Sequence, residues 1–148
     1  MIKLFKLIAF AVILSLSLTA CDKDGDDTGD DITIFKATLV GSSEVPSNPS
    51  TATGSTTLTY DAGTMRFTAV TTYSGLTPTA GHIHIADVGM NGPVEFPFVI
   101  VPSPITLQSG VLTQVQVDEL FNGRMYVNLH TTAYPGGEIR GQLVKQSY

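Results

Sequence analysis

Two of the three histidines stand one residue apart in "GHIHIADVGM" (81–90), and the third follows in "YVNLHT" (126–131). Imidazole nitrogens are common ligands of copper and zinc. On an extended strand, His82 and His84 project from one face, about 6.5–7 Å apart. Their rings can tilt toward one ion, and His130 on a neighbouring strand can supply a third nitrogen, with zinc–nitrogen bonds of about 2.0–2.1 Å. The sequence therefore presents one candidate metal site, with copper or zinc as the cofactor.

The alternation of apolar and polar residues predicts which way the histidines point. Successive side chains of a strand face opposite sides of a sheet. In "HIHI", Ile83 and Ile85 are expected in the core, so both histidines face the other side. The same rule applied to "MYVNLHT" and "GEIRGQL" puts four more polar residues outside the core: Asn128, His130, Glu138 and Arg140. The spacing leaves open whether "HIHI" lies beside the other two strands.

Two other interpretations of these residues remain. In a structural one, the histidines hydrogen-bond to loops and to Glu138, and Arg140 forms an ion pair with Glu138. In a binding one, Asn128, Glu138 and Arg140 belong to a surface that recognises a protein or a glycan. An enzyme is less favoured, because no serine stands in a nucleophile-elbow motif and no pair of close carboxylates is evident.

The composition and the turn signals favour short strands, because Thr, Val, Gly and Pro are frequent and Lys, Glu and Ala are few. One segment, "LTQVQVDELFNG" (112–123), reads as a helix with a capping box formed by Thr113 and Gln116. Pro135 and Gly136 predict a type II turn between the last two strands, with a positive φ at Gly136. The expected fold is all-β, an antiparallel Greek-key β-sandwich with one short helix. The expected strands are 32–40, 54–61, 64–73, 80–87, 94–100, 105–110, 123–131 and 137–145.

The first 31 residues are not expected to belong to the domain. Residues 1–20 have a basic start and an apolar run that ends at "LTAC", which resembles the lipobox of bacterial lipoproteins. Cys21, the only cysteine, is the expected lipidation site. Residues 21–31 include six aspartates and form an expected acidic tether. The predicted location is the bacterial cell envelope, with the domain held by its lipid at the outer membrane and exposed at the cell surface.

The remaining residues, 32–148, are enough for one domain with its own core. The formal net charge of the chain is −5, and most of it lies in the tether. A nearly neutral domain argues against nucleic acid as a partner, because phosphate binding requires a basic face. The expected partners are the membrane, through the lipid, and a protein or glycan.

Four linked strings in this region, "HIH", "NGPV", "YVNLHT" and "PGGEIRGQL", resemble the CHRD domain, a module first described in chordin. Glu44-Val45-Pro46 and Gly75-Leu76 also stand at recognisable places. The resemblance covers nearly all of residues 33–145. It implies a Greek-key β-sandwich and an extracytoplasmic location, and it implies no activity. A similar His-x-His strand supplies copper ligands in the copper–zinc superoxide dismutases, whose architecture such a sandwich could share.

Overall fold

The computed structural model describes residues 32–147, so the predicted signal, Cys21 and the acidic tether lie outside the described residues. The described region is mostly strands with one α-helix, as expected, and within it no helix is long and apolar enough to cross a membrane. The elements are β1 (Ile32–Val40), η1 (Gly41–Ser43), β2 (Thr53–Asp61), β3 (Arg66–Ser74), β4 (Ala80–Ile85), β5 (Val94–Pro97), β6 (Ile105–Gln108), α1 (Gln114–Phe121), β7 (Met125–His130), β8 (Ile139–Gln142) and β9 (Val144–Lys145).

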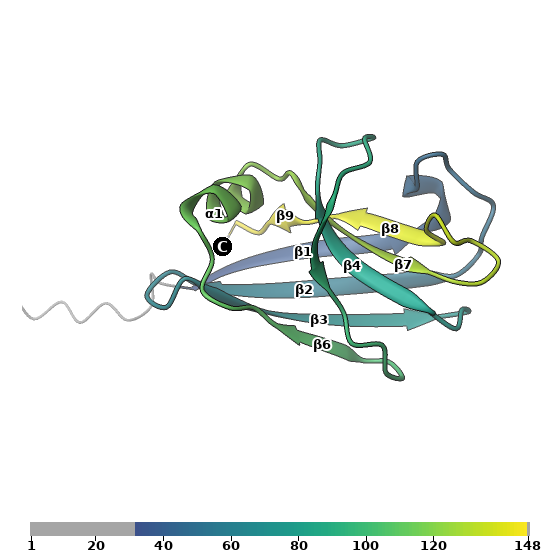
Figure 1. Ribbon diagram of the computed structural model, residues 1–148, viewed down its shortest axis with the longest axis horizontal. Coiled ribbons are helices and arrows are strands. Elements are labelled where there is room, and N and C mark those ends of the chain that lie inside the picture. The colour runs from purple at the N-terminus through teal and green to yellow at the C-terminus, as the bar shows by residue number, and fades with distance from the viewer. Residues whose placement is uncertain (1–31, 148) are drawn as a thin grey trace, which may run out of the picture.

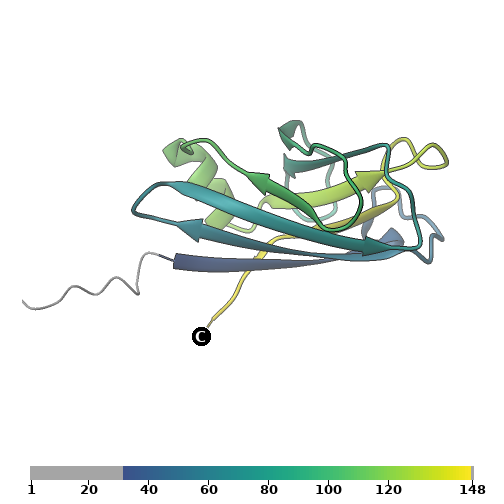
Figure 2. The same ribbon diagram turned by 90° about the horizontal axis from the view of Figure 1, so that it is seen from below.

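All strands belong to one antiparallel sheet in the order β5-β4-β7-β8-β1-β2-β3-β6, with β9 beside β1. The sheet is strongly curled into a half-barrel, so its two halves face each other across the core. In Figure 1, β4 and β7 cross over the long strands β1, β2 and β3, and Figure 2 shows these layers from the side. The two layers of the expected sandwich are therefore two parts of one continuous sheet.

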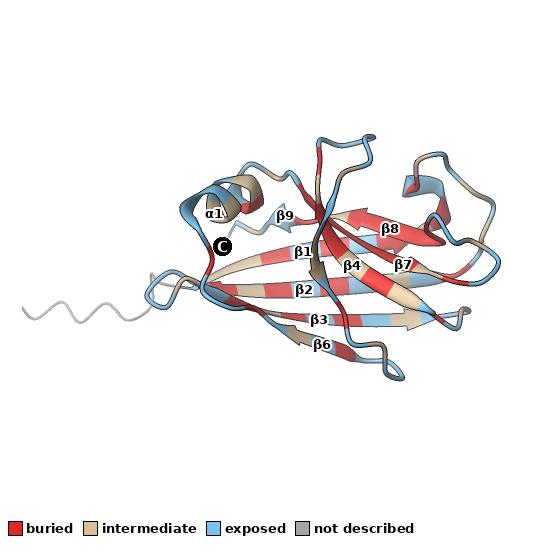
Figure 3. Ribbon diagram, in the orientation of Figure 1, coloured by how far each residue is buried: buried red, intermediate tan, exposed pale blue. Residues whose placement is uncertain are grey.

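Burial follows the strand alternation in one half of the sheet and not in the other (Figure 3). Along β1, β2 and β3, buried residues alternate with exposed or half-buried ones. In β7 and β8, nearly every residue is buried. The expected core residues are fully buried, apart from the half-buried Ile85: Ile83, Val127, Leu129, Ile139 and Leu143. The second face of β7 and β8, which carries the polar side chains, is therefore covered as well.

Loops cover that polar face. The side chain of Asn48, in the loop after η1, donates to the carbonyl oxygens of Gly137 and Glu138 at 3.2 and 3.0 Å. The side chain of Asn91, in the loop between β4 and β5, donates to the carbonyl oxygen of Val45 at 2.8 Å. These bonds tie the loop after η1 both to the β7–β8 turn, at the end of the sheet opposite α1, and to the loop after β4 (Figure 1).

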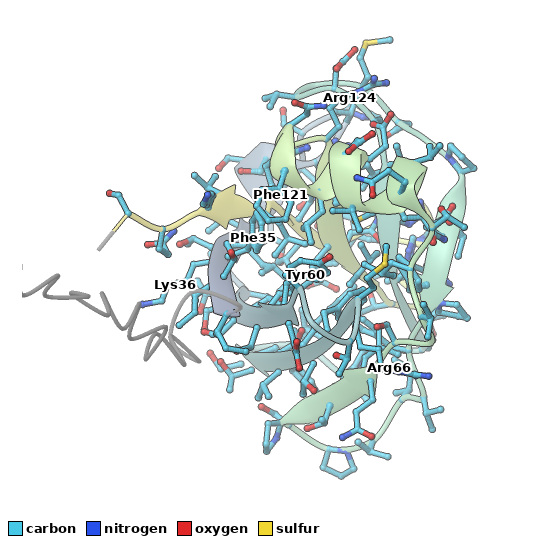
Figure 4. All side chains as sticks on the ribbon, turned by 90° about the vertical axis from the view of Figure 1, so that its left-hand side faces the viewer. Phe35, Lys36, Tyr60, Arg66, Phe121 and Arg124 are labelled. Carbon is cyan, nitrogen blue, oxygen red and sulfur yellow. The ribbon has the colours of Figure 1, made fainter. Side chains whose placement is uncertain are left out.

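Helix α1 covers the other end of the half-barrel, and its predicted capping box is present. The Thr113 hydroxyl accepts from the backbone N–H of Gln116, and the Gln116 side chain accepts from the backbone N–H of Thr113. Phe121 then packs edge-to-face on Phe35 and Tyr60, with ring centroids 5.3 and 5.6 Å apart (Figure 4). The helix thus places an aromatic side chain over the end of the core.

The predicted β7–β8 hairpin exists, but its turn differs from the expected one. The N–H of Gly137 donates to the carbonyl oxygen of Tyr134 at 3.1 Å, which closes a β-turn with Pro135 and Gly136 at its centre. The positive φ of 132° belongs to Gly137 and not to Gly136, so the type II prediction was wrong. This φ favours glycine at position 137, and the carboxyl group of Glu44 packs closely against it.

Candidate functional site

Strand β7 lies between β4 and β8, and this order assembles the polar residues that the sequence analysis singled out. In the antiparallel register, His82 pairs with Asn128 and His84 pairs with Tyr126. On the other side of β7, Asn128 pairs with Arg140. The question that the spacing left open is thus answered, because "HIHI" is the direct neighbour of the strand that carries Asn128 and His130.

The three histidines form one cluster. One ring nitrogen from each of His82, His84 and His130 lies within 4.8 Å of the other two. Three nitrogens bound to one tetrahedral zinc ion at about 2.0–2.1 Å stand about 3.4 Å from one another. Binding of a single ion therefore requires the nitrogens to move closer together, from separations of up to 4.8 Å. The cluster is set among loops, with His84 buried and the other two half-buried.

His130 is oriented by the turn that follows it. Its Nδ1 lies 3.0 Å from the carbonyl oxygen of Pro135. A carbonyl oxygen only accepts, so Nδ1 carries the proton and Nε2 of a neutral ring keeps its lone pair. A backbone carbonyl in this position is the usual second partner of a metal-binding histidine. His130 is therefore prepared to offer Nε2 as a ligand.

The free nitrogen of His130 faces His82. Nδ1 of His82 lies 3.0 Å from Nε2 of His130. Two lone pairs repel at this distance, so a proton or another cation must lie between the two atoms. In the metal-free protein, His82 supplies the proton from Nδ1. A metal ion can take the place of that proton if the same proton shifts from Nδ1 to Nε2 of His82, since a neutral ring carries only one.

His84 is held on both sides. Its Nδ1 lies 3.0 Å from the carbonyl oxygen of Gly92, and its Nε2 lies 3.0 Å from Oδ1 of Asn128. A neutral imidazole has one N–H, and the carbonyl oxygen of Gly92 requires it on Nδ1, because a carbonyl only accepts hydrogen bonds. The Asn128 amide can then donate from Nδ2 to the Nε2 lone pair once it is turned by 180°, since amide orientation is assigned from the network. Asn128 is thus the group that a metal ion must displace from His84.

The environment keeps two of the imidazoles neutral. Burial lowers the pKa of His82 below its ordinary value, and the neighbouring His130 and His84 lower it further. Burial also lowers the pKa of His130, although its hydrogen bond to Pro135 acts in the opposite direction. Metal ligation requires deprotonated nitrogens, so these shifts favour metal over protons.

Tyr126 and Arg140 support the cluster from the side. The ring of Tyr126 stacks on His84, with centroids 4.8 Å apart and planes 3° apart. The guanidinium carbon of Arg140 lies 3.4 Å from the centroid of the Tyr126 ring, a cation–π contact. The hydroxyl of Tyr126 accepts from the backbone N–H of Gly92, the residue whose carbonyl holds His84. Tyr126 therefore limits the motion of the His84 ring.

The expected ion pair between Glu138 and Arg140 does not form. Both side chains are buried, and Glu138 accepts from the hydroxyls of Ser50 at 2.7 Å and Thr131 at 2.5 Å. Arg140 instead donates to the loop that follows β4. The physical reason is that β8 begins at Ile139, so Glu138 lies before the strand and turns toward the loop after η1. Glu138 thus acts on the loops and not on the histidine cluster.

One buried acid was not recognised as a candidate from the sequence. Glu44 was noted only as part of a family string, yet its carboxyl is buried beside Gly137 and its Oε1 has no hydrogen-bond partner among the described residues. An acidic residue in a loop is normally exposed. Only the fold of three separate loops makes it buried, so the sequence held no direct signal of it.

A comparison with protein families found that residues 35–143 match the family described as CHRD domain. Neither the curated proteins nor the solved structures gave a match to the chain.

Proposed function

The chain belongs to the CHRD domain family, and we propose that its domain is a non-catalytic module that binds one copper or zinc ion through His82, His84 and His130. The observation that carries this proposal is the convergence of three imidazoles from two neighbouring strands within 4.8 Å. Sequence spacing allowed such a cluster but did not require it.

The donor set indicates the class of metal. Three neutral imidazole nitrogens suit copper and zinc, whereas magnesium and calcium prefer oxygen ligands. Divalent copper is expected to bind more tightly than zinc at equal geometry. Three protein ligands leave a coordination position for water or for a ligand.

The location is also part of the proposal. We infer that lipidation of Cys21 holds the domain at the bacterial outer membrane, with residues 22–31 as the tether. The lipobox-like "LTAC" and the acidic composition after it support this inference. A protein or glycan partner remains a prediction.

Metal titration of the purified protein tests the proposal. Binding is measured by calorimetry after any affinity tag has been removed. We expect one copper or zinc ion to bind per chain. His82→Ala and His130→Ala are each expected to weaken binding at least 100-fold, because each removes one of three ligands. Gln108→Ala, on β6, serves as the control that leaves affinity unchanged.

The structural interpretation of the histidines makes a different prediction. If the imidazoles only connect strands and loops, His130→Ala will lower the melting temperature and the wild-type protein will take up no metal at stoichiometric concentration. That pair of results would reject the metal site.

A further inference from the structure

A second polar site adjoins the histidine cluster, because its residue Arg140 packs on Tyr126, which in turn stacks on His84. A cavity of about 300 Å³ lies between the segment around η1, the loop after β4 and strand β8. Its mouth is formed by exposed residues that include Ser42, Ser43 and Val88, and its floor by buried ones. Two of the floor residues, Glu44 and Arg140, carry opposite charges.

Arg140 is only 2 % exposed, and the described residues give it no salt bridge. Its Nη1 donates to Oδ1 of Asn91 at 3.0 Å, and its Nη2 donates to the carbonyl oxygen of Met90 at 2.7 Å. A guanidinium has five N–H groups, so further donors remain. These two neutral acceptors do not neutralise a buried cation, which is costly to leave without a counter-charge.

Within the part of the chain that the structure describes, Glu44 is a buried acid that lacks a salt-bridge partner, just as Arg140 is a buried cation that lacks a counter-charge. It is 6 % exposed, and its Oε1 is buried with no hydrogen-bond partner among residues 32–147. Burial raises the pKa of Glu44 to about 7, although the positive charge of Arg140 acts in the opposite direction. The charge of Arg140 thus affects Glu44, but the two side chains form no salt bridge. Both of them line the cavity.

We propose that this cavity binds a small α-amino acid, with its ammonium group at Glu44 and its carboxylate at Arg140. A zwitterion supplies both missing charges at once, whereas a single ion leaves one buried charge unpaired. Arginine suits a carboxylate because its planar N–H groups match the two oxygens. Val45 and Val88 add apolar walls, and a volume of about 300 Å³ admits an amino acid such as alanine.

Calorimetry with L-alanine at pH 8 tests the proposal on the protein purified in detergent as the host cell processes it. We expect saturable binding of one alanine per chain. Propionate and ethylammonium, which each keep only one of the two charges, are expected to bind at least tenfold more weakly. Glu44→Gln keeps the size of the side chain and removes its charge, so it is expected to weaken alanine binding at least tenfold.

Glu95→Gln provides the matched control. Glu95 lies on β5, accepts from the side chain of Gln116 and does not line the cavity, so this change should leave alanine affinity as it is. Thermal unfolding establishes that each variant is folded. Absence of saturable binding to folded wild-type protein, equal binding by Glu44→Gln, or equal binding of either single-charge analogue would overturn the proposal. Ordered water would then be the occupant of the cavity.

Discussion

In the proposed metal site, the Nε2 atom of His84 has two competing partners, the side-chain amide of Asn128 and the metal ion. The amide holds the ring in the metal-free protein at 3.0 Å, and the ion must displace it. Alternation of side chains predicted that His84 and Asn128 share a face. It could not predict that they touch, because the neighbour of β4 depends on the path of the whole chain.

Asn128→Leu separates these two roles of the residue. The change removes the amide and keeps the number and branching of the heavy atoms, so we expect the metal-free protein to lose about 1–3 kcal/mol of stability from an unsatisfied buried group. Metal affinity is expected to stay equal or to rise, because His84 is then free. Urea unfolding without metal and calorimetric titration with copper measure the two effects. A loss of affinity as large as that of His82→Ala would show that Asn128 is itself needed for binding.

Glu44 gives the stability of the ligand-free protein a predictable pH dependence. Its pKa is raised from 4.5 to about 7 in the folded state, so the folded protein holds more protons than the unfolded chain between these values. Stability from this group is therefore full below about pH 4.5 and is lost as the pH rises through 7, by on the order of 3 kcal/mol. Relative to wild type, Glu44→Gln should gain stability between pH 5 and pH 8. A pH-independent difference between the two proteins would argue against a raised pKa.

At the scale of elements, the sequence predicted the features that depend on residues close together in the chain. The capping box at Thr113 and the core-facing residues of β4, β7 and β8 were confirmed, since each depends on periodicity within one segment. The position of the positive φ at Gly137 was missed, because this turn packs against the carboxyl of Glu44, which comes from a distant loop. The covering of the polar face was also missed, because the loops that cover it come from distant parts of the chain.

The capping box of α1 offers a test at this scale. Thr113→Ala removes the hydroxyl that accepts from the Gln116 backbone, and we expect a loss of about 0.5–2 kcal/mol in stability. Gln114→Ala changes an exposed neighbour whose side chain donates to Asp118, so it should change stability by less than about 0.5 kcal/mol. Chemical unfolding measures both. Equal effects would mean that the cap does not fix the helix over the core.

At the scale of the whole molecule, the proposed metal site joins parts that are distant in sequence. His82 and His84 lie on β4, and His130 ends β7, where the turn that covers the site begins. An ion bound to all three therefore stabilises the folded state and has no preformed site in the unfolded chain.

This linkage predicts a metal-dependent stability. At free metal 100 times the dissociation constant, the free energy of unfolding should rise by about 2.7 kcal/mol. Thermal unfolding with copper and with a chelator measures the difference, which should disappear in His82→Ala. A rise of the same size in that variant would place the stabilising ion elsewhere.

X-ray absorption spectroscopy of the protein loaded with one equivalent of copper or zinc tests the central claim most directly. We expect a first shell that contains three imidazole nitrogens, at about 2.0–2.1 Å for zinc. A shell of oxygens alone, or one with fewer than two imidazoles, would contradict a site made by His82, His84 and His130.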